Sequence, residues 1–241
     1  MGTTYVDRNL DPHQALLRYT RFHDLVDILK FNQLPCAYAG TGRGRALLDA
    51  VDWQPGTGRA GPPAANAGMA HRFDAADHGV AFQCWDAVDP SGWHAGAYDP
   101  ERPLVGMLSS VHALAEALVP GDGDIYIGRM RAGRDAAGQA GAGDAGARVV
   151  VFSVLEDGGV PPSEPDLRLF VDVRRILTGI VLPAEAPPRF RSLVGKVVQE
   201  HAWVSVTIAA PADRRGPRPA RRWSATCAAT PAGTARPTPA R

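Results

Sequence analysis

Two strand-like runs decide the fold: Val80-Ala81-Phe82-Gln83-Cys84-Trp85 and Ile125-Tyr126-Ile127-Gly128-Arg129. Both are rich in β-branched and aromatic residues, and Gly79 and Pro90 flank the first, which is typical of strands. Further strand patterns lie near residues 16, 152, 170 and 206. The sequence therefore predicts a β-sheet built from these strands.

Helical spacing alternates with these strands. Apolar residues recur at one helical face in three segments, which begin at Phe22, Val111 and Phe190. Thr20 is the expected N-cap of the first helix, Ser109 or Ser110 caps the second, and Pro187-Pro188 starts the third. The sequence predicts one α+β domain over residues 1–210, with helices packed on a mixed, largely antiparallel sheet.

Gly-, Ala- and Pro-rich segments interrupt this pattern. We expect low-complexity inserts near 54–70 and 131–147, and a disordered Arg/Ala/Pro-rich tail over 211–241. None of them carries enough apolar residues to build a core.

Composition excludes several classes of protein. Lys and Arg number 26 and Asp and Glu 25, so the net charge of +1 gives no field that favours nucleic acid. The three cysteines are widely spaced, which argues against a disulfide framework and a zinc cluster. No apolar run approaches the roughly 20 residues of a membrane span. We expect a cytoplasmic protein without a metal, and a protein partner before a membrane or a nucleic acid.

Arg18 is the best candidate for an anion contact. It lies in the hydrophobic run from Leu16 to Thr20, where a guanidinium must be paired or face a binding cleft. The alternative to an anion contact is that Arg18 lies at the surface on an edge strand, with its hydrogen bonds made to the protein or to water.

Aromatic residues mark a second candidate region. Trp93 and Tyr98 follow Trp85 in a polar, Gly-containing loop, where they either pack over the core or contact a ligand or partner.

Two other motifs favour plain structural interpretations. The glycines of Gly40-Thr41-Gly42-Arg43-Gly44 lack the third glycine of a dinucleotide-binding turn, because Arg45 occupies that position. A flexible turn is expected there. Cys84 lies between Phe82 and Trp85, where a buried cysteine is more typical than a nucleophile.

Three blocks of the chain resemble the bacterial domain-of-unknown-function family 2971. They are Leu17-Arg18-Tyr19-Thr20 with the helix that follows, the stretch from Cys84 to Arg129, and the stretch from Val171 to His201. Together they cover somewhat over half of the chain.

The opening strand also looks like the start of some bacterial ADP-ribosyltransferase-type domains. That resemblance implies NAD as the cofactor, with Arg18 and Tyr19 at its binding site and Ser109-Ser110 as the bracing segment. A late carboxylate would stabilise the transition state, but the acidic pair of related sequences is reduced here to Asp144, followed by Arg148. Asp144 and Arg148 are therefore the catalytic candidates, and the resemblance implies a degenerate site.

Two functions stay open. The first is an uncharacterised bacterial domain, serving defence or stress response, with a degenerate nucleotide-binding cleft. The second is a non-catalytic protein-binding or regulatory module that uses the Trp93/Tyr98 loop. An enzyme should bring Arg18, Arg148 and a carboxylate into one pocket, whereas a binding module should expose an aromatic patch.

Overall fold

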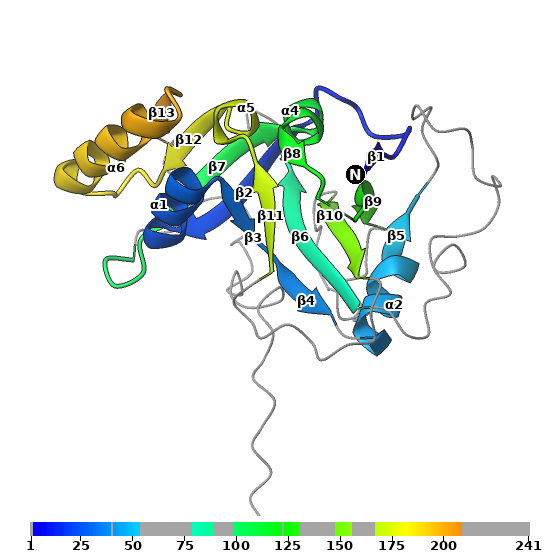
Figure 1. Cartoon of the computed structure of the whole chain (residues 1–241). Coiled ribbons are helices and arrows are strands. Elements are labelled where there is room, and N and C mark those ends of the chain that lie inside the picture. The colour runs from blue at the N-terminus through cyan, green and yellow to red at the C-terminus, as the bar shows by residue number, and fades with distance from the viewer. Residues whose placement is uncertain are drawn as a thin grey trace, which may run out of the picture.

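The computed structural model describes residues 2–39, 41–53, 79–88, 99–121, 123–130, 148–155 and 167–208. They form a ten-stranded mixed sheet, a three-stranded sheet and five helices (Figure 1). The prediction of an α+β fold with a mixed, largely antiparallel sheet is confirmed. The predicted inserts near 54–70 and 131–147 and the predicted tail over 211–241 lie outside the described residues.

The large sheet is antiparallel except at its two ends, where β1 pairs with β9 and β12 pairs with β13 in parallel. Its strand order is β1 (Thr4–Val6), β9 (Ile125–Met130), β10 (Arg148–Leu155), β6 (Gly79–Ala87), β2 (Ala15–Arg21), β7 (Leu104–Ser110), β12 (Gly179–Leu182) and β13 (Val206–Ile208). Two short strands lie off this path, namely β4 (Ala37–Ala39), which pairs with β6, and β5 (Val51–Asp52), which pairs with β9.

The large sheet consists of two half-sheets that meet between β2 and β6. β2 pairs with β6 only where Leu16 lies opposite Ala87 and Leu17 lies opposite Asp86. Further along β6, β4 takes the place of β2 and pairs from Phe82 to Val80. β2 and β6 thus diverge, as Figure 1 shows. We call the stretch of β6 between these two partners, around Gln83, the junction.

The three-stranded sheet has the order β3 (Gln33–Pro35), β11 (Arg168–Val171) and β8 (Leu118–Val119). The strand expected near residue 170 therefore belongs to this sheet and not to the large one. The run from Leu34 to Ala39 is divided between β3 and β4 at Cys36.

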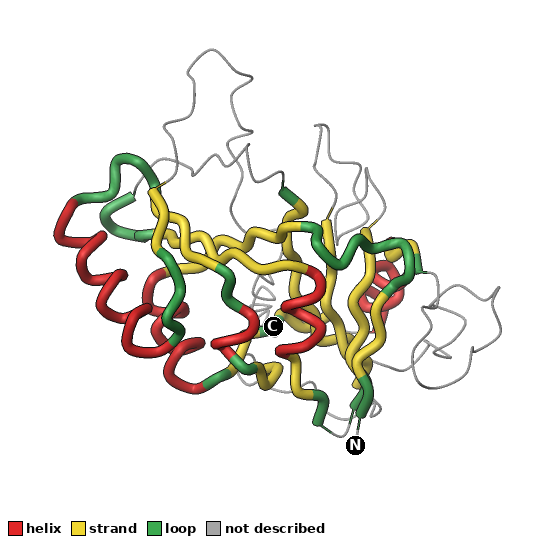
Figure 2. Tube along the Cα trace, turned by 90° about the horizontal axis from the view of Figure 1, so that it is seen from above, coloured by secondary structure: helices red, strands yellow, loops and turns green. Residues whose placement is uncertain are grey.

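Helices cover both faces of the large sheet, but unequally. The main core lies on the face that we call inner, beneath α1 (Phe22–Phe31), α4 (Val111–Ala117), α5 (Val173–Ile176) and α6 (Pro188–His201). A second core, on the outer face of β6, β10 and β9, contains Leu47 and Leu48 of α2 (Thr41–Ala50). Figure 2 shows most of the helical turns on one side of the strands.

The helix caps only partly follow the sequence patterns. Ser110 caps α4, as expected, because its hydroxyl accepts from the backbone N–H of Ala113 at 3.1 Å. The expectation for Thr20 is wrong, since Thr20 is a buried residue of β2 and Arg21 occupies the N-cap of α1 without a side-chain bond. Pro188 occupies the first turn of α6 as predicted.

Three segments differ from the sequence expectations. Gly42 and Gly44 lie inside α2 and not in a turn. β7 and β12 are buried central strands that the patterns miss. One glycine and two serines weaken the strand signal of β7, and β12 is only four residues long. No helix of the described ranges is long and apolar enough to cross a membrane.

Candidate functional site

Arg18 lies on the inner face of the large sheet, beside the junction. Side chains alternate along a strand, so Leu16 and Arg18 of β2 share the inner face, whereas Leu17 and Tyr19 point to the outer one. The Arg18 Nη2 donates to the carbonyl oxygen of Pro35 across a long distance of 3.4 Å. A strand of one half-sheet thus extends a guanidinium toward the link between β3 and β4.

Gln83 reaches the same carbonyl from the other half-sheet. Its Nε2 donates to Pro35 O at 2.6 Å, and its side chain is 3% exposed. Cys36 follows Pro35, and its backbone N–H donates to Leu167 O at 2.9 Å. Arg18, Pro35, Cys36 and Gln83 form what we call the polar node.

The thiol of the polar node is that of Cys36, which is partly buried. Burial raises the pKa of Cys36 to about 11, although the charge of Arg18 and hydrogen bonds from Leu169 and Gln83 act in the opposite direction. Because the thiolate is the reactive form, the raised pKa favours a packing role for the partly buried Cys36 over a nucleophilic one.

A second polar group lies on the outer face, where the half-sheets meet. Arg148 of β10 lies opposite Asp86 of β6, with 3.3 Å between Arg148 Nε and Asp86 Oδ1. Burial raises the pKa of Asp86, and Arg148 lowers it in part. Burial and the nearby Asp86 raise the pKa of Tyr19 to about 12. We call Tyr19, Asp86 and Arg148 the outer-face trio.

The structure separates Arg18 from Arg148. Leu17 lies opposite Asp86, and Asp86 lies opposite Arg148, so these three share the outer face. Arg18, next to Leu17, points to the inner face. The two arginines therefore do not meet in one pocket, and the catalytic candidate Asp144 lies outside the described residues.

Asp86 is a functional candidate that the sequence reasoning missed. It follows Cys84 and Trp85 at the end of an apolar strand, and an acidic residue in such a run is a signal for a paired or functional carboxylate. Gln83 was missed as well, although a polar residue within the apolar run itself is a similar signal.

The two serines expected to brace a cofactor have structural roles. Ser110 is engaged as the α4 cap, and the Ser109 hydroxyl, on a 3% exposed side chain, donates to Ser110 O at 3.4 Å. Ser109 lies opposite Leu16, two positions along the ladder from the pair of Arg18 with Met107. Ser109 is thus a diagonal neighbour of Arg18 on the inner face.

Trp85 belongs to the core and not to a loop that meets a ligand or partner. It lies in β6, is 1% exposed and packs in the main core. The other two residues predicted for that loop, Trp93 and Tyr98, lie outside the described residues.

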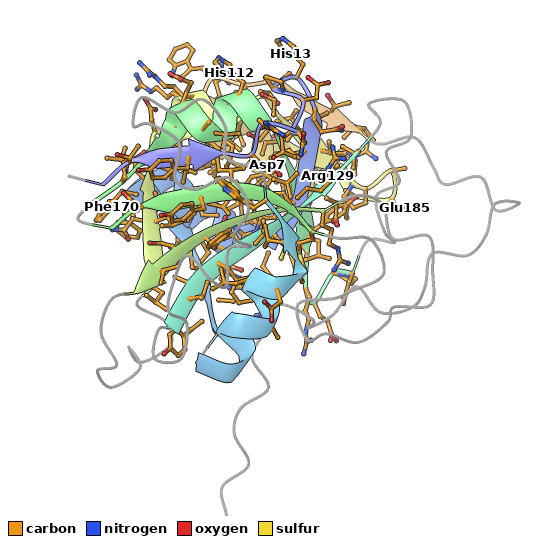
Figure 3. All side chains as sticks on the ribbon, turned by 90° about the vertical axis from the view of Figure 1, so that its right-hand side faces the viewer. Asp7, His13, His112, Arg129, Phe170 and Glu185 are labelled. Atoms are coloured by element: carbon orange, nitrogen blue, oxygen red, sulfur yellow. The ribbon has the colours of Figure 1, made fainter. Side chains whose placement is uncertain are left out.

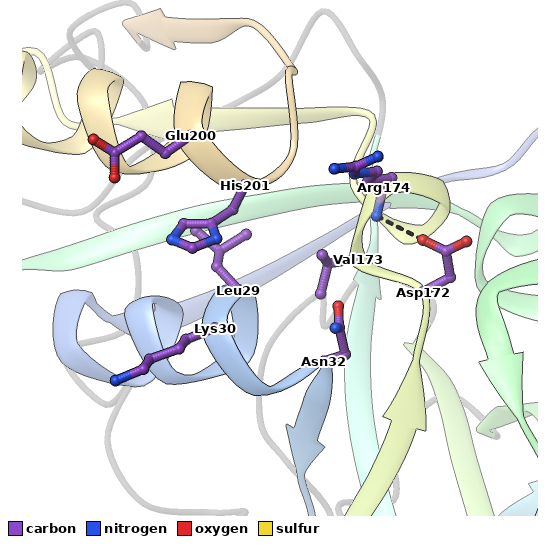
Figure 4. Close-up of a pocket in the computed structure, with 8 residues that line it drawn as sticks. All are labelled: Leu29, Lys30, Asn32, Asp172, Val173, Arg174, Glu200 and His201. Carbon is purple, nitrogen blue, oxygen red and sulfur yellow. Dashed lines mark hydrogen bonds between the residues drawn. The ribbon is translucent and has the colours of Figure 1, made fainter.

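A polar pocket of about 410 Å³ lies where the ends of three helices meet (Figure 4). It contains none of the candidate residues; its lining is Leu29, Lys30, Asn32, Asp172, Val173, Arg174, Glu200 and His201. Asp172 caps α5 through the backbone N–H of Arg174 at 3.0 Å. Within the described ranges, no group of three His, Cys, Asp or Glu side chains is placed to hold a metal ion.

No protein-family model and no curated protein match the chain. The resemblance to family 2971 therefore stays a prediction. Structures of DarT from Thermus sp. 2.9 with carba-NAD+ and with NAD+ each align at 11% identity and a TM-score of 0.38, over 83% of this chain and 96% and 98% of theirs. A third, with ADP-ribosylated ssDNA, aligns at 12% identity and a TM-score of 0.36, over 84% of this chain and 97% of that one. These values establish neither family nor activity.

Proposed function

We propose that this protein binds NAD or a related nucleotide at the junction, as a degenerate domain of ADP-ribosyltransferase type. The observation that carries the proposal is the position of Arg18, on the inner face where β2 and β6 diverge. The opening strand resembles those in which such an arginine holds the cofactor.

The chemistry of the polar node suits a phosphate. A guanidinium offers a planar fork of donors that matches phosphate oxygens, and such charge-assisted bonds are roughly twice as strong as neutral ones. A phosphate would therefore compete effectively with the long bond from Arg18 to Pro35 O. Gln83 would hold Pro35 in place through its shorter bond while Arg18 turns toward the ligand.

The same geometry favours binding without group transfer. Among the described residues, no carboxylate belongs to the polar node, and Arg148 pairs with Asp86 on the opposite face. Loss of a preorganised charge at a reaction centre costs about 3–4 kcal/mol of transition-state stabilisation. We therefore propose nucleotide binding and no efficient transfer of ADP-ribose.

The test is calorimetry and thermal denaturation of the full chain with NAD. A ligand present at about 100 times its Kd should stabilise the protein by about 2.7 kcal/mol. Arg18→Ala should abolish this gain, Arg18→Lys should keep part of it, and Arg175→Ala serves as the control, because Arg175 pairs with Asp172 at the surface. A cooperative melt that NAD leaves unchanged in the wild type overturns the proposal.

A second candidate is a protein-binding module, favoured by an exposed apolar pair on the three-stranded sheet. Phe170 of β11 lies opposite Val119 of β8, and their side chains are 56% and 54% exposed. Figure 3 places Phe170 at the edge of the described chain. This surface is a further patch that a protein partner would contact, beside the Trp93/Tyr98 loop, which lies outside the described residues. The protein-binding function is the favoured one if no nucleotide binds.

A further inference from the structure

The polar pocket of about 410 Å³ lies away from the polar node, where the ends of α1, α5 and α6 meet (Figure 4). Its volume falls within the range of small-molecule sites, roughly 300–1,000 Å³. Leu29 and Val173 give it an apolar base, with exposures of 2% and 4%. Asn32 lines it just before β3, whereas Arg18 contacts Pro35 at the other end of β3. The pocket is therefore separate from the site of the proposed nucleotide binding.

Three polar side chains from three elements surround the pocket. Arg174 belongs to α5, His201 is the last residue of α6, and Asn32 is the C-cap of α1. Figure 4 shows them on different sides of the pocket. Among the residues that the structure describes, none of these three side chains has a hydrogen bond or an ion pair. Their polar groups are therefore available to a ligand.

Arg174 and Arg175 are neighbours in α5 but differ in their partners. The Arg175 Nε lies 3.4 Å from Asp172 Oδ2, and Asp172 Oδ1 accepts from the backbone N–H of Arg174 at 3.0 Å. Both oxygens of the Asp172 carboxylate are thus engaged. Within the described ranges, the guanidinium of Arg174 has no counter-ion, so its charge can be neutralised by a bound anion.

The other charged residues of the lining are turned elsewhere. The Lys30 Nζ lies 5.2 Å from the centroid of the Phe31 ring. The Glu200 carboxylate lies on the side of α6 away from Arg174 and Asn32 (Figure 4). The groups that face the pocket are therefore a guanidinium, an imidazole and a carboxamide, and each of them can donate hydrogen bonds.

We infer that this pocket binds a small organic anion, either a phosphate ester or a carboxylate. The planar guanidinium of Arg174 matches two anionic oxygens at once, and His201 supplies a second donor that is positively charged when protonated. The Asn32 amide binds a neighbouring polar group of the ligand. The negative ends of the α1 and α6 dipoles oppose an anion, so the affinity depends on Arg174 and His201.

The test is titration calorimetry of the full chain carrying Arg18→Ala, with glucose 6-phosphate, succinate and inorganic phosphate as probes. Arg18→Ala removes the phosphate contact of the proposed function, so the heat reports on the pocket. We expect an organic anion to bind more tightly than inorganic phosphate, and a further Arg174→Ala to weaken it about tenfold. Whichever organic anion binds more tightly identifies the anionic group of the ligand.

Two further variants test the sign of the charge. Glu200→Gln removes a negative charge near the site and should strengthen the binding of the anion about twofold. Arg189→Ala is the matched control for Arg174→Ala, because it removes the same charge from an exposed position in the first turn of α6. It lies about 18 Å from His201 at 1.5 Å per residue, beyond the Debye length of about 10 Å at 0.1 M salt, and should leave the affinity unchanged.

Proton NMR locates the ligand independently of the heat. The ring signals of His201, identified by their loss in His201→Gln, should shift when the organic anion is added. The site is overturned if neither organic anion binds more tightly than inorganic phosphate, or if a cooperatively melting Arg174→Ala binds as well as its parent. Weaker binding in Glu200→Gln overturns the assignment to an anion. None of these results bears on the nucleotide site, because Arg18 is already replaced.

Discussion

Asp86 and Arg148 face each other across β6 and β10 at 3.3 Å, and yet the pKa of Asp86 is raised. Burial disfavours the carboxylate more than the arginine favours it. The folded protein therefore holds this proton more strongly than the unfolded chain does.

This relationship predicts a pH effect on stability. A carboxyl whose pKa is raised on folding stabilises the protein fully below its ordinary pKa of 3.8, and that contribution is lost as the pH rises through the higher pKa of the folded state. Asp86→Asn removes this pH-dependent contribution. As the pH rises from about 4 to neutrality, the free energy of unfolding of the variant should therefore increase relative to that of the wild type. Urea denaturation at several pH values measures this. Asp27→Asn, on the exposed surface of α1, is the control. A decrease in the stability of Asp86→Asn relative to wild type over the same pH range contradicts the prediction.

Ser110→Ala should destabilise the protein by about 1 kcal/mol, because the N-cap bond to Ala113 is lost. Ser109→Ala should cost less, since its hydroxyl makes only a long bond to the neighbouring carbonyl. Chemical denaturation measures both. If Ser110 instead braces a cofactor, its substitution weakens nucleotide binding beyond what Ser109→Ala does.

Gly128→Ala and Gly195→Ala should change stability in opposite directions. A Cβ at Gly128 would lie 2.7 Å from Val51 Cγ1, so the side chain of Val51 must shift, at a cost of about 1–3 kcal/mol. At Gly195, in the middle of α6, nothing lies within 4 Å of the new atom, and alanine should gain about 0.5–1 kcal/mol. Thermal melts of the two variants compare the signs directly. A Gly128→Ala variant as stable as the wild type would show that the packing of β5 on β9 is not tight.

Trp203→Gly should raise stability by about 1 kcal/mol, because Trp203 has a left-handed φ of 57° just after α6, where glycine is preferred. The side chain is 76% exposed, so little packing is lost. Trp203→Ala removes the same ring and keeps the Cβ. It should show no such gain, and equal melting temperatures for the two variants would argue against backbone strain.

Much of the fold follows from local patterns. Long runs of β-branched residues, as in β10, and a single apolar helical face, as in α1, specify their own structure. β7 and β12 are different, because their strand character comes from neighbours on both sides and is weakly encoded by residues such as Gly106 and Gly179.

The candidate site was less predictable than the fold. Arg18 was found because a charge stands out in an apolar strand, and the structure places it beside the junction. Gln83 binds the same carbonyl oxygen of Pro35 and was not found. It lies 48 positions from Pro35 along the chain, so no local pattern indicates the contact. The face of the sheet on which the Arg148 side chain lies depends on the register between β10 and β6, and no local pattern fixes that register.

The change of partner along β6 has a mechanical consequence. Arg18 belongs to one half-sheet and Gln83 to the other, and both bind one carbonyl. A small rotation between the half-sheets alters the separation of these donors before it opens either core. Under the proposed function, substitutions of apolar residues where the half-sheets meet, such as Leu16 and Leu17, should therefore change the affinity for the ligand without touching a ligand atom.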